Sequence, residues 1–479
     1  MIRRSMRNML ACVLICAAHV ISASEPDPDP WIAWRAEIQT DPAAAEQRFA
    51  SELAGMPESS EPTLARTIVE IKLLSAQIAQ GNDQDAELSR LASLADQAAL
   101  LGDLRAAMQA WRECSRRYFV RGDYVRAQSA AQHLLDMARR LGARKDEAQA
   151  LNDLGVLAKR RGDIRMAIVH YENALGIRRT IADESGTAQT LGNLALIEKN
   201  RGSLLQALKY QREAHRIRER LAQGPLLANS HDSLGLIYLA MNDAEEAERE
   251  FRAALAVGDT PKNQDNISNS RNNLALALMK QGRVDEAEAA ARQVYDYAVA
   301  RDRRPMLTSA ATTLASILRR RGELRDAGQL AKDALEIGRE VGDSKEIIEP
   351  LLERAEWQLA SSNANAAAVD LSEAMTLARR DQLRLLEYQA LELQSRIQFA
   401  QGDSSAAFKT RQDYEQMGQE LLGADTLRQM AALLSEEAFA HASDAQSKEV
   451  TQVRAGPGLG VVMLVFLSGL VLGLLQRRR

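Results

Sequence analysis

A ladder of small polar side chains is the feature of this sequence that could do chemistry. Its members recur every 40 positions, at Asp153, Asn193, Ser233, Asn273 and Thr313. An asparagine side chain carries both a donor and an acceptor, so a row of asparagines can hydrogen-bond the backbone of an extended peptide. The spacing therefore predicts a binding surface rather than a reactive centre.

A second, mostly cationic set lies six and seven residues further along each repeat. It runs Lys159-Arg160, Lys199-Asn200, Leu239-Ala240, Met279-Lys280 and Arg319-Arg320. Lysine and arginine can pair with carboxylates on a ligand. We therefore expect a groove for an acidic or extended polypeptide at Asp153, Lys159, Arg160, Asn193, Lys199, Asn200, Asn273, Lys280, Arg319 and Arg320. Glu353 and Leu393 interrupt the pattern, so the groove should end near Ala315. The alternative is that these are solvated charges on helix surfaces.

Signatures of catalysis are missing from the sequence. It contains no Gly-x-Ser-x-Gly, no phosphate-binding loop and no His-Glu-x-x-His. A metal site needs two or more converging ligands, but the histidines after residue 24 fall at different phases of the repeat: His133, His170, His215, His231 and His441. We expect no enzyme activity, no metal and no cofactor.

The positions that hold these side chains belong to a strict internal repeat. Turn residues recur every 40 positions, at Gly122, Gly162, Gly202, Asn242, Gly282, Gly322, Ser362 and Gly402, and an alanine follows each by five places. The stretch Leu154–Arg178 is typical of two short helices joined by Gly162-Asp163. No such pair can bury its apolar face alone, so stacked pairs must share one core. The sequence predicts an all-α solenoid of about nine helix pairs.

These repeats resemble the tetratricopeptide repeat. Its pattern is a small residue, then alanine, an aromatic residue and alanine at 12, 16 and 19 places further on. That pattern is met by Gly155, Ala167, Tyr171 and Ala174, and again by Gly235, Ala247, Phe251 and Ala254. The 40-residue unit is similar to the long variant of kinesin light chain. The resemblance implies a right-handed superhelix with the first helix of each pair on the concave face, and peptide contacts at Asn193 and Asn273.

Both ends of the chain have the character of targeting segments. Residues 1–24 carry Arg3, Arg4 and Arg7 before an apolar stretch, which is typical of a signal peptide. Leu459–Leu475 has no charge and is followed by Gln476 and three arginines. We expect a membrane helix with the body of the protein in the periplasm. Gly469 and Gly473 are spaced so that two such helices could pair in a homodimer.

The predicted organisation has six parts. They are a signal peptide (1–24), an N-terminal helical cap (25–62), the repeats (63–422), a capping helix and flexible linker (423–456), a transmembrane helix (457–476) and a cytoplasmic basic tail (477–479). The net charge is −4, and because both ends are basic the part between them is more acidic than the whole. This charge disfavours nucleic acid as a partner.

Three functions fit this organisation. The first is a membrane-anchored, periplasm-facing scaffold that binds proteins or peptides. The second is the sensory component of a bacterial signalling system that lacks its own output domain. The third is a surface or secreted protein with a cleavable C-terminal sorting tail. We expect the scaffold, because the ladder of asparagines and flanking cations is a binding feature.

Overall fold

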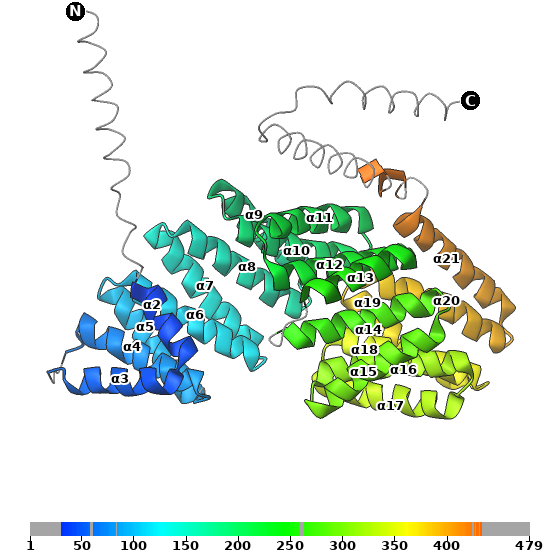
Figure 1. The fold of residues 1–479 in the computed structure, drawn as a ribbon, viewed down its shortest axis with the longest axis horizontal. Coiled ribbons are helices and arrows are strands. Elements are labelled where there is room, and N and C mark those ends of the chain that lie inside the picture. Colours follow the sequence, from blue (N-terminus) through cyan, green and yellow to red (C-terminus); the bar gives the residue numbers. More distant parts are fainter. Residues whose placement is uncertain are drawn as a thin grey trace, which may run out of the picture.

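The computed structural model describes residues 30–57, 61–82, 84–258, 263–423, 426, 428–430 and 432–433. Regular structure in these residues is entirely α-helical (Figure 1). The helices are α2 (Pro30–Thr40), α3 (Pro42–Ala54), α4 (Leu64–Ala79), α5 (Asp85–Leu100), α6 (Leu104–Val120), α7 (Tyr124–Leu141), α8 (Arg144–Arg160), α9 (Ile164–Thr180), α10 (Glu184–Asn200), α11 (Leu204–Arg220), α12 (Gly224–Ala240), α13 (Ala244–Gly258), α14 (Gln264–Lys280), α15 (Val284–Ala300), α16 (Arg304–Arg321), α17 (Leu324–Val341), α18 (Ser344–Ala360), α19 (Ala364–Arg380), α20 (Arg384–Ala400) and α21 (Ser404–Leu422).

From α4 onward the helices form antiparallel pairs, and the first helix of each pair has the even number. The turn inside each pair holds one residue with positive φ, at Gly81, Gly122, Gly162, Gly202, Asn242, Gly282, Gly322, Ser362 and Gly402. Positive φ is the left-handed region, which glycine enters without steric cost. The predicted 40-residue register is confirmed, and so is the all-α solenoid.

The residue after the turn begins the second helix of a pair. The carboxylate of Asp163 accepts a hydrogen bond from the backbone N–H of Met166 at 3.0 Å. Asp123 and Asp403 cap their helices in the same way. A short polar side chain satisfies one of the free N–H groups at a helix start. A glycine followed by an aspartate therefore ends one helix and begins the next.

Within a pair, the two helices approach closely at a glycine. A Cβ on Gly155 would lie 2.6 Å from Cε1 of Tyr171, and one on Gly235 would lie 2.5 Å from Cε1 of Phe251. Both aromatic side chains are fully buried, as is Ala167. The predicted motif is confirmed, since a small residue on the first helix makes room for a ring on the second.

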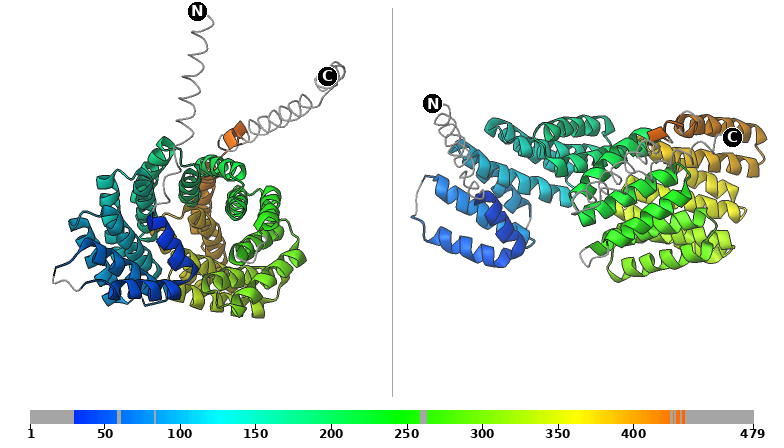
Figure 2. Two further views of the ribbon diagram at one scale, coloured as in Figure 1. Left: turned by 60° about the vertical axis from the view of Figure 1, so that its left-hand side comes forward. Right: turned by 45° about the horizontal axis from the view of Figure 1, so that its top comes forward.

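The first helices form the inner layer of the array. Each contacts the next first helix from α10 through to α20. Neighbouring elements of a curved array are closest on its concave side, so these helices line the concave face. Figure 2 shows the pairs following one another around a central axis.

The array winds far enough for its C-terminal end to return to its middle. Helix α10 contacts α20 (Figure 2). The Arg160 guanidinium at the end of α8 pairs with Asp343, which precedes α18, at 2.7 Å. Gly202, between α10 and α11, lies against Leu421, where a Cβ would overlap the leucine side chain. Met430 is buried in the apolar cluster that includes the start of α11. These contacts together are called the seam.

Helices α2 and α3 lie over the first repeats. Trp34 and Ile38 of α2 and Phe49 of α3 are buried in the same core as the helices that follow. Helix α2 contacts α4 and α6, and α3 contacts α4. Apolar surface at the open end of the array is covered in this way, as a solenoid requires.

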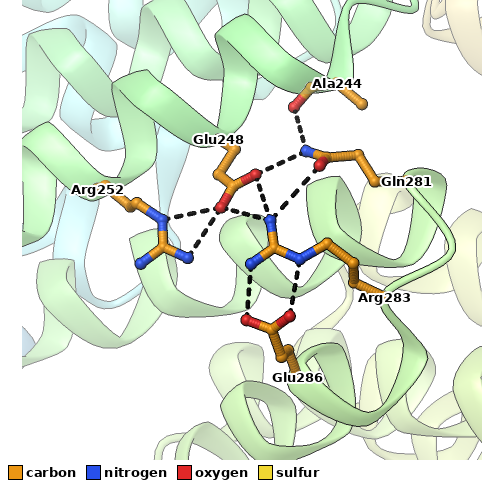
Figure 3. A network of polar contacts seen from close by, with 6 residues as sticks. All are labelled: Ala244, Glu248, Arg252, Gln281, Arg283 and Glu286. Atoms are coloured by element: carbon orange, nitrogen blue, oxygen red, sulfur yellow. Dashed lines mark hydrogen bonds and ion pairs between the residues drawn. The ribbon is translucent and has the colours of Figure 1, made fainter.

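Ion pairs tie several pairs of helices to the next pair, as the network in Figure 3 illustrates. Glu248 of α13 accepts hydrogen bonds from Arg283 at 2.7 Å and from Gln281 at 2.8 Å. Arg252 also donates to Glu248, and Arg283 pairs with Glu286. Burial would raise the pKa of Glu248, but these hydrogen bonds outweigh it and lower the pKa. The carboxylate thus stays ionised and holds α13 on the turn before α15.

The membrane localisation needs correction. Among the described helices none is both long and apolar enough to cross a bilayer. They run from 11 to 19 residues. The predicted single-pass inner-membrane location is therefore wrong on this finding. Residues 1–24 and 457–476, with Gly469 and Gly473, lie outside the described residues.

Candidate functional site

The asparagines of the predicted ladder link neighbouring first helices. The amide nitrogen of Asn193 on α10 donates to Oδ1 of Asn152 on α8 at 3.1 Å. Asn273 on α14 makes the matching bond to Oδ1 of Asp232 on α12 at 3.0 Å. Because both bonds join equivalent positions, the two asparagines lie on the same side of the array.

The other members of the ladder are bonded within their own helices. The Asp153 carboxylate accepts from Nε2 of Gln149 at 2.8 Å, and burial raises its pKa. The hydroxyls of Ser233 and Thr313 each donate to a backbone carbonyl one turn earlier. The ladder is therefore a strip of hydrogen-bonded polar side chains with few formal charges.

Lysines of three repeats lie at the C-terminal ends of the first helices that carry the strip. Burial lowers the pKa of Lys159, Lys199 and Lys280, and at Lys199 it falls to about 8. The pKa of Lys199 is also lowered by Lys345 of α18, whereas Glu349 and Asp232 raise it. Groups about 150 residues apart in the chain thus face each other across the inside of the superhelix.

The arginines beside these lysines are already bonded. Arg160 pairs with Asp343 in the seam. Arg320 donates to the backbone carbonyl of Met279 at 3.4 Å. Lys280 donates to Oδ1 of Asn242 at 3.1 Å, and it lies near enough to Arg320 and to Glu392 of α20 for both to act on its pKa. The charges of these cations are therefore partly offset by other groups of the same chain.

Arg319 differs from the other predicted cations. Its guanidinium makes two hydrogen bonds to Glu353 of α18, at 2.7 and 3.1 Å. Glu353 is 7% exposed, and burial raises its pKa despite this partner. Leu393, the other residue that interrupts the predicted pattern, is buried as well. Arg319 and Glu353 thus join α16 to α18, while Asn200 stays half-buried.

The inner face presents amide, hydroxyl and charged side chains. Within the described ranges, no three His, Cys, Asp or Glu side chains are placed to hold a metal ion. His215 and His231 pack edge to face with ring centroids 4.6 Å apart, and Nδ1 of His231 lies 2.7 Å from Glu250. This cluster ties α11, α12 and α13 together.

Two buried arginines escaped the sequence reasoning. Arg178 of α9 is 1% exposed and Arg218 of α11 is 9% exposed. They stand 40 residues apart, at a position where other repeats have alanine or glycine: Ala138, Gly258, Ala298, Gly338 and Ala378. Comparing the residues at this position across the repeats would have identified them, because a long cation at this position must pass between two first helices.

Comparison with known proteins agrees with this fold. Models of the tetratricopeptide repeat family match residues 186–258 and, separately, 268–298 and 307–341. No curated protein matches the sequence. A solved Rap protein complexed with Competence and Sporulation Factor is similar over 73% of this chain and 96% of its own, at 16% identity and a TM-score of 0.55.

Two further solved structures are similar. The apo form of RapI aligns over 73% of this chain and 96% of its own, at 16% identity and a TM-score of 0.56. A Podosopora anserina protein described as a kinesin light chain with TPR-like repeats aligns over 41% of this chain and 96% of its own, at 17% identity and a TM-score of 0.35. The two Rap structures show a common fold. The predicted tetratricopeptide repeats are therefore confirmed over the residues that the family models match.

Proposed function

We propose that this protein is a binding scaffold that takes an extended, carboxylate-bearing segment of a protein or peptide on its inner face. The residues proposed to contact it are Asp153, Lys159, Arg160, Asn193, Lys199, Asn200, Asn273, Lys280, Arg319 and Arg320. Of these residues, Arg319 is also paired with Glu353 of the same chain.

One observation carries the proposal. The lysines at the inner ends of three first helices are partly desolvated, and the pKa of Lys199 falls to about 8. A cation that has lost water gains more from an anionic partner than a solvated one does. The polar strip beside these lysines offers amide groups that can donate to and accept from a peptide backbone. Together they favour a ligand with both carboxylates and free peptide groups.

Site-specific crosslinking in cells tests this proposal. A photoreactive residue is placed at Asn193 or Asn273 on the inner face, and at Lys209, which is exposed on the second helix α11, as a control. The proposal expects the same peptide or protein to be captured from both inner positions and not from position 209. Equal capture from all three positions would contradict it.

Charge reversal tests the same surface on the purified chain and the captured ligand. The variant R160E/K199E/R320E should bind at least tenfold more weakly. The variant R165E/K209E/R325E changes the net charge equally at exposed positions of second helices and should bind as the wild type does. Circular dichroism and melting of both variants check that the fold is retained, since Arg160 also takes part in the seam.

A sensory role is a second candidate, and the seam favours it. Arg160 beside the proposed groove pairs with Asp343 from a later repeat, so a ligand near Arg160 would touch residues of both turns. Binding could then change how the two turns pack. Hydrogen exchange around residues 341–345, measured with and without the captured ligand, should change in this case and stay constant for a passive scaffold.

A further inference from the structure

Arg218 is a buried cation without a carboxylate partner. It is 9% exposed, and its guanidinium donates to Oγ of Ser230 at 2.6 Å and to the backbone carbonyl of Ala188 at 3.4 Å. Burial lowers its pKa, and no charged group in the described part of the chain offsets that effect. A buried charge is normally paired, because removing an ion from water is costly.

Arg178 provides the comparison one repeat earlier. Its guanidinium donates to the Gly186 carbonyl, to Oγ1 of Thr190 and to Oε1 of Gln149, each at 2.6 Å. Two carboxylates act against the effect of burial on its pKa: Asp183, whose Oδ2 lies 3.8 Å from the arginine Nε, and Asp153. Carboxylates of the same chain therefore partly offset the burial of Arg178.

Both of these carboxylates are absent one repeat later. Gln223 stands 40 residues after Asp183, and Asn193 stands 40 residues after Asp153. The neutral acceptor is kept, since Ser230 takes the place of Thr190. The repeat around Arg218 thus keeps the hydroxyl of the Arg178 site and has amides in place of its counter-charges.

The residue of α10 next to the Arg218 guanidinium is a glycine, Gly192. Neighbouring repeats carry Asn152, Asp232 and Asn272 at the position where this repeat has Gly192. A Cβ on Gly192 would lie 3.5 Å from Nη2 of Arg218 and 3.9 Å from Oε1 of Gln211, with no closer atom. Gly192 remains partly exposed on α10, beside Asn193. An atom placed at the position of that Cβ would therefore contact the guanidinium without overlapping any other atom.

We infer that Arg218 binds a carboxylate that enters at Gly192. A guanidinium has five N–H donors in a planar fork that matches a carboxylate, and the described contacts use two of them. The carboxylate belongs either to an acidic residue of a bound polypeptide or to a free small acid. Only the polypeptide source of the carboxylate rests on the proposed function. The site itself is formed by Arg218 and Gly192.

The test uses the full chain in two titrations at constant ionic strength. In the first, acetate replaces chloride, and binding is followed by the melting temperature and by calorimetry. In the second, the ligands are the capped tripeptides Gly-Glu-Gly and Gly-Gln-Gly. We expect acetate and the Glu peptide to raise the melting temperature, and the Gln peptide to bind at least tenfold more weakly than the Glu peptide.

Four variants separate Arg218 from other causes. R218Q should lose at least tenfold in acetate affinity, whereas R178Q should keep the acetate response although it melts at a lower temperature. G192D supplies a carboxylate from the chain itself, so it should melt higher than the wild type in chloride and no longer respond to acetate. G192N, which has the same shape without the charge, should not melt higher.

The outcomes distinguish this inference from the proposed function. Equal acetate responses in the wild type and R218Q, or loss of the response in R178Q as well, would overturn the site. An acetate response that needs Arg218, with Glu and Gln peptides binding equally, would support the site with a free acid as ligand and would count against the polypeptide groove.

Discussion

At the scale of single residues, helical glycines have opposite roles that depend on what faces them. Gly155 faces the ring of Tyr171, whereas Gly176 of α9 is exposed with nothing within 4 Å of the position of a Cβ. Replacing Gly155 by alanine should lower the free energy of unfolding by about 1–3 kcal/mol, because the added methyl overpacks the core. Replacing Gly176 by alanine should raise it by up to about 1 kcal/mol through helix propensity. Urea denaturation of both variants measures whether the two changes in the free energy of unfolding have opposite signs.

Lys199 gives a pH-dependent prediction. Its pKa of about 8 in the folded chain lies below its ordinary value of 10.5. Between these values the unfolded chain keeps a proton that the folded chain has released, so the free energy of unfolding should rise with pH in this window. The variant K199M should lose that rise. Acylation followed by mass spectrometry should show half-maximal labelling of Lys199 near pH 8, and a midpoint near 10.5 would contradict the prediction.

Much of the residue-scale pattern could be predicted from the sequence. Turn glycines and the Gly155–Tyr171 motif repeat at a fixed interval, and repetition separates them from chance. Arg178 and Arg218 were missed, because two arginines in an Arg-rich chain look like surface charges unless their position is compared across the repeats. Their burial depends on how far apart α8, α10 and α12 lie, which a local pattern does not specify.

At the scale of helices, one position of the repeat controls how closely neighbouring first helices pack. In α17 it is Gly338, where a Cβ would overlap the carbonyl of Glu346 in the next helix. In α9 it is Arg178, whose guanidinium bonds to both α8 and α10. Glycine lets the backbones approach, and arginine fills the space between them.

The buried pair between α16 and α18 carries a prediction at this scale. R319M leaves the buried carboxylate of Glu353 without its bidentate partner, which should cost about 3–5 kcal/mol of the free energy of unfolding. The control is R339M, which breaks the exposed pair of Arg339 and Glu373 and should cost about 1 kcal/mol or less. Both are measured by chemical denaturation. Equal losses would show that burial does not matter for these pairs.

Helix boundaries were accessible to sequence reasoning because each is marked chemically. Gly162 ends one helix and Asp163 caps the next, so the boundary rests on two adjacent residues. The partner of each arginine was not accessible. Arg319 reaches a glutamate 34 residues further on, and only the packing of two repeats brings those side chains together.

At the scale of the whole molecule, the seam is the feature that the repeat pattern does not contain. Its residues are far apart in the chain, as Arg160 and Asp343 are, and each looks like an ordinary surface residue. Whether two turns touch depends on the sum of many small rotations between repeats. Sequence patterns within one repeat do not specify each rotation precisely enough for the sum of the rotations to be predicted. The concave face is therefore partly enclosed by the protein's own later repeats, which the sequence reasoning did not anticipate.

The seam can be tested with two matched glycines. Gly202 and Gly282 occupy the same turn position with φ of 80° and 79°. Alanine at either site adopts an unfavourable left-handed backbone, which should cost about 1–2 kcal/mol. Only at position 202 does the new Cβ also overlap Leu421, since nothing lies within 4 Å of the Cβ position at 282.

G202A should therefore separate α21 from the turn between α10 and α11, whereas G282A should leave them in contact. Small-angle scattering should show a larger radius of gyration for G202A, and hydrogen exchange should be faster in residues 404–422. G282A, with a similar loss of stability, controls for general loosening of the fold. If both variants keep the radius of the wild type, or both expand equally, the seam does not hold the two turns together.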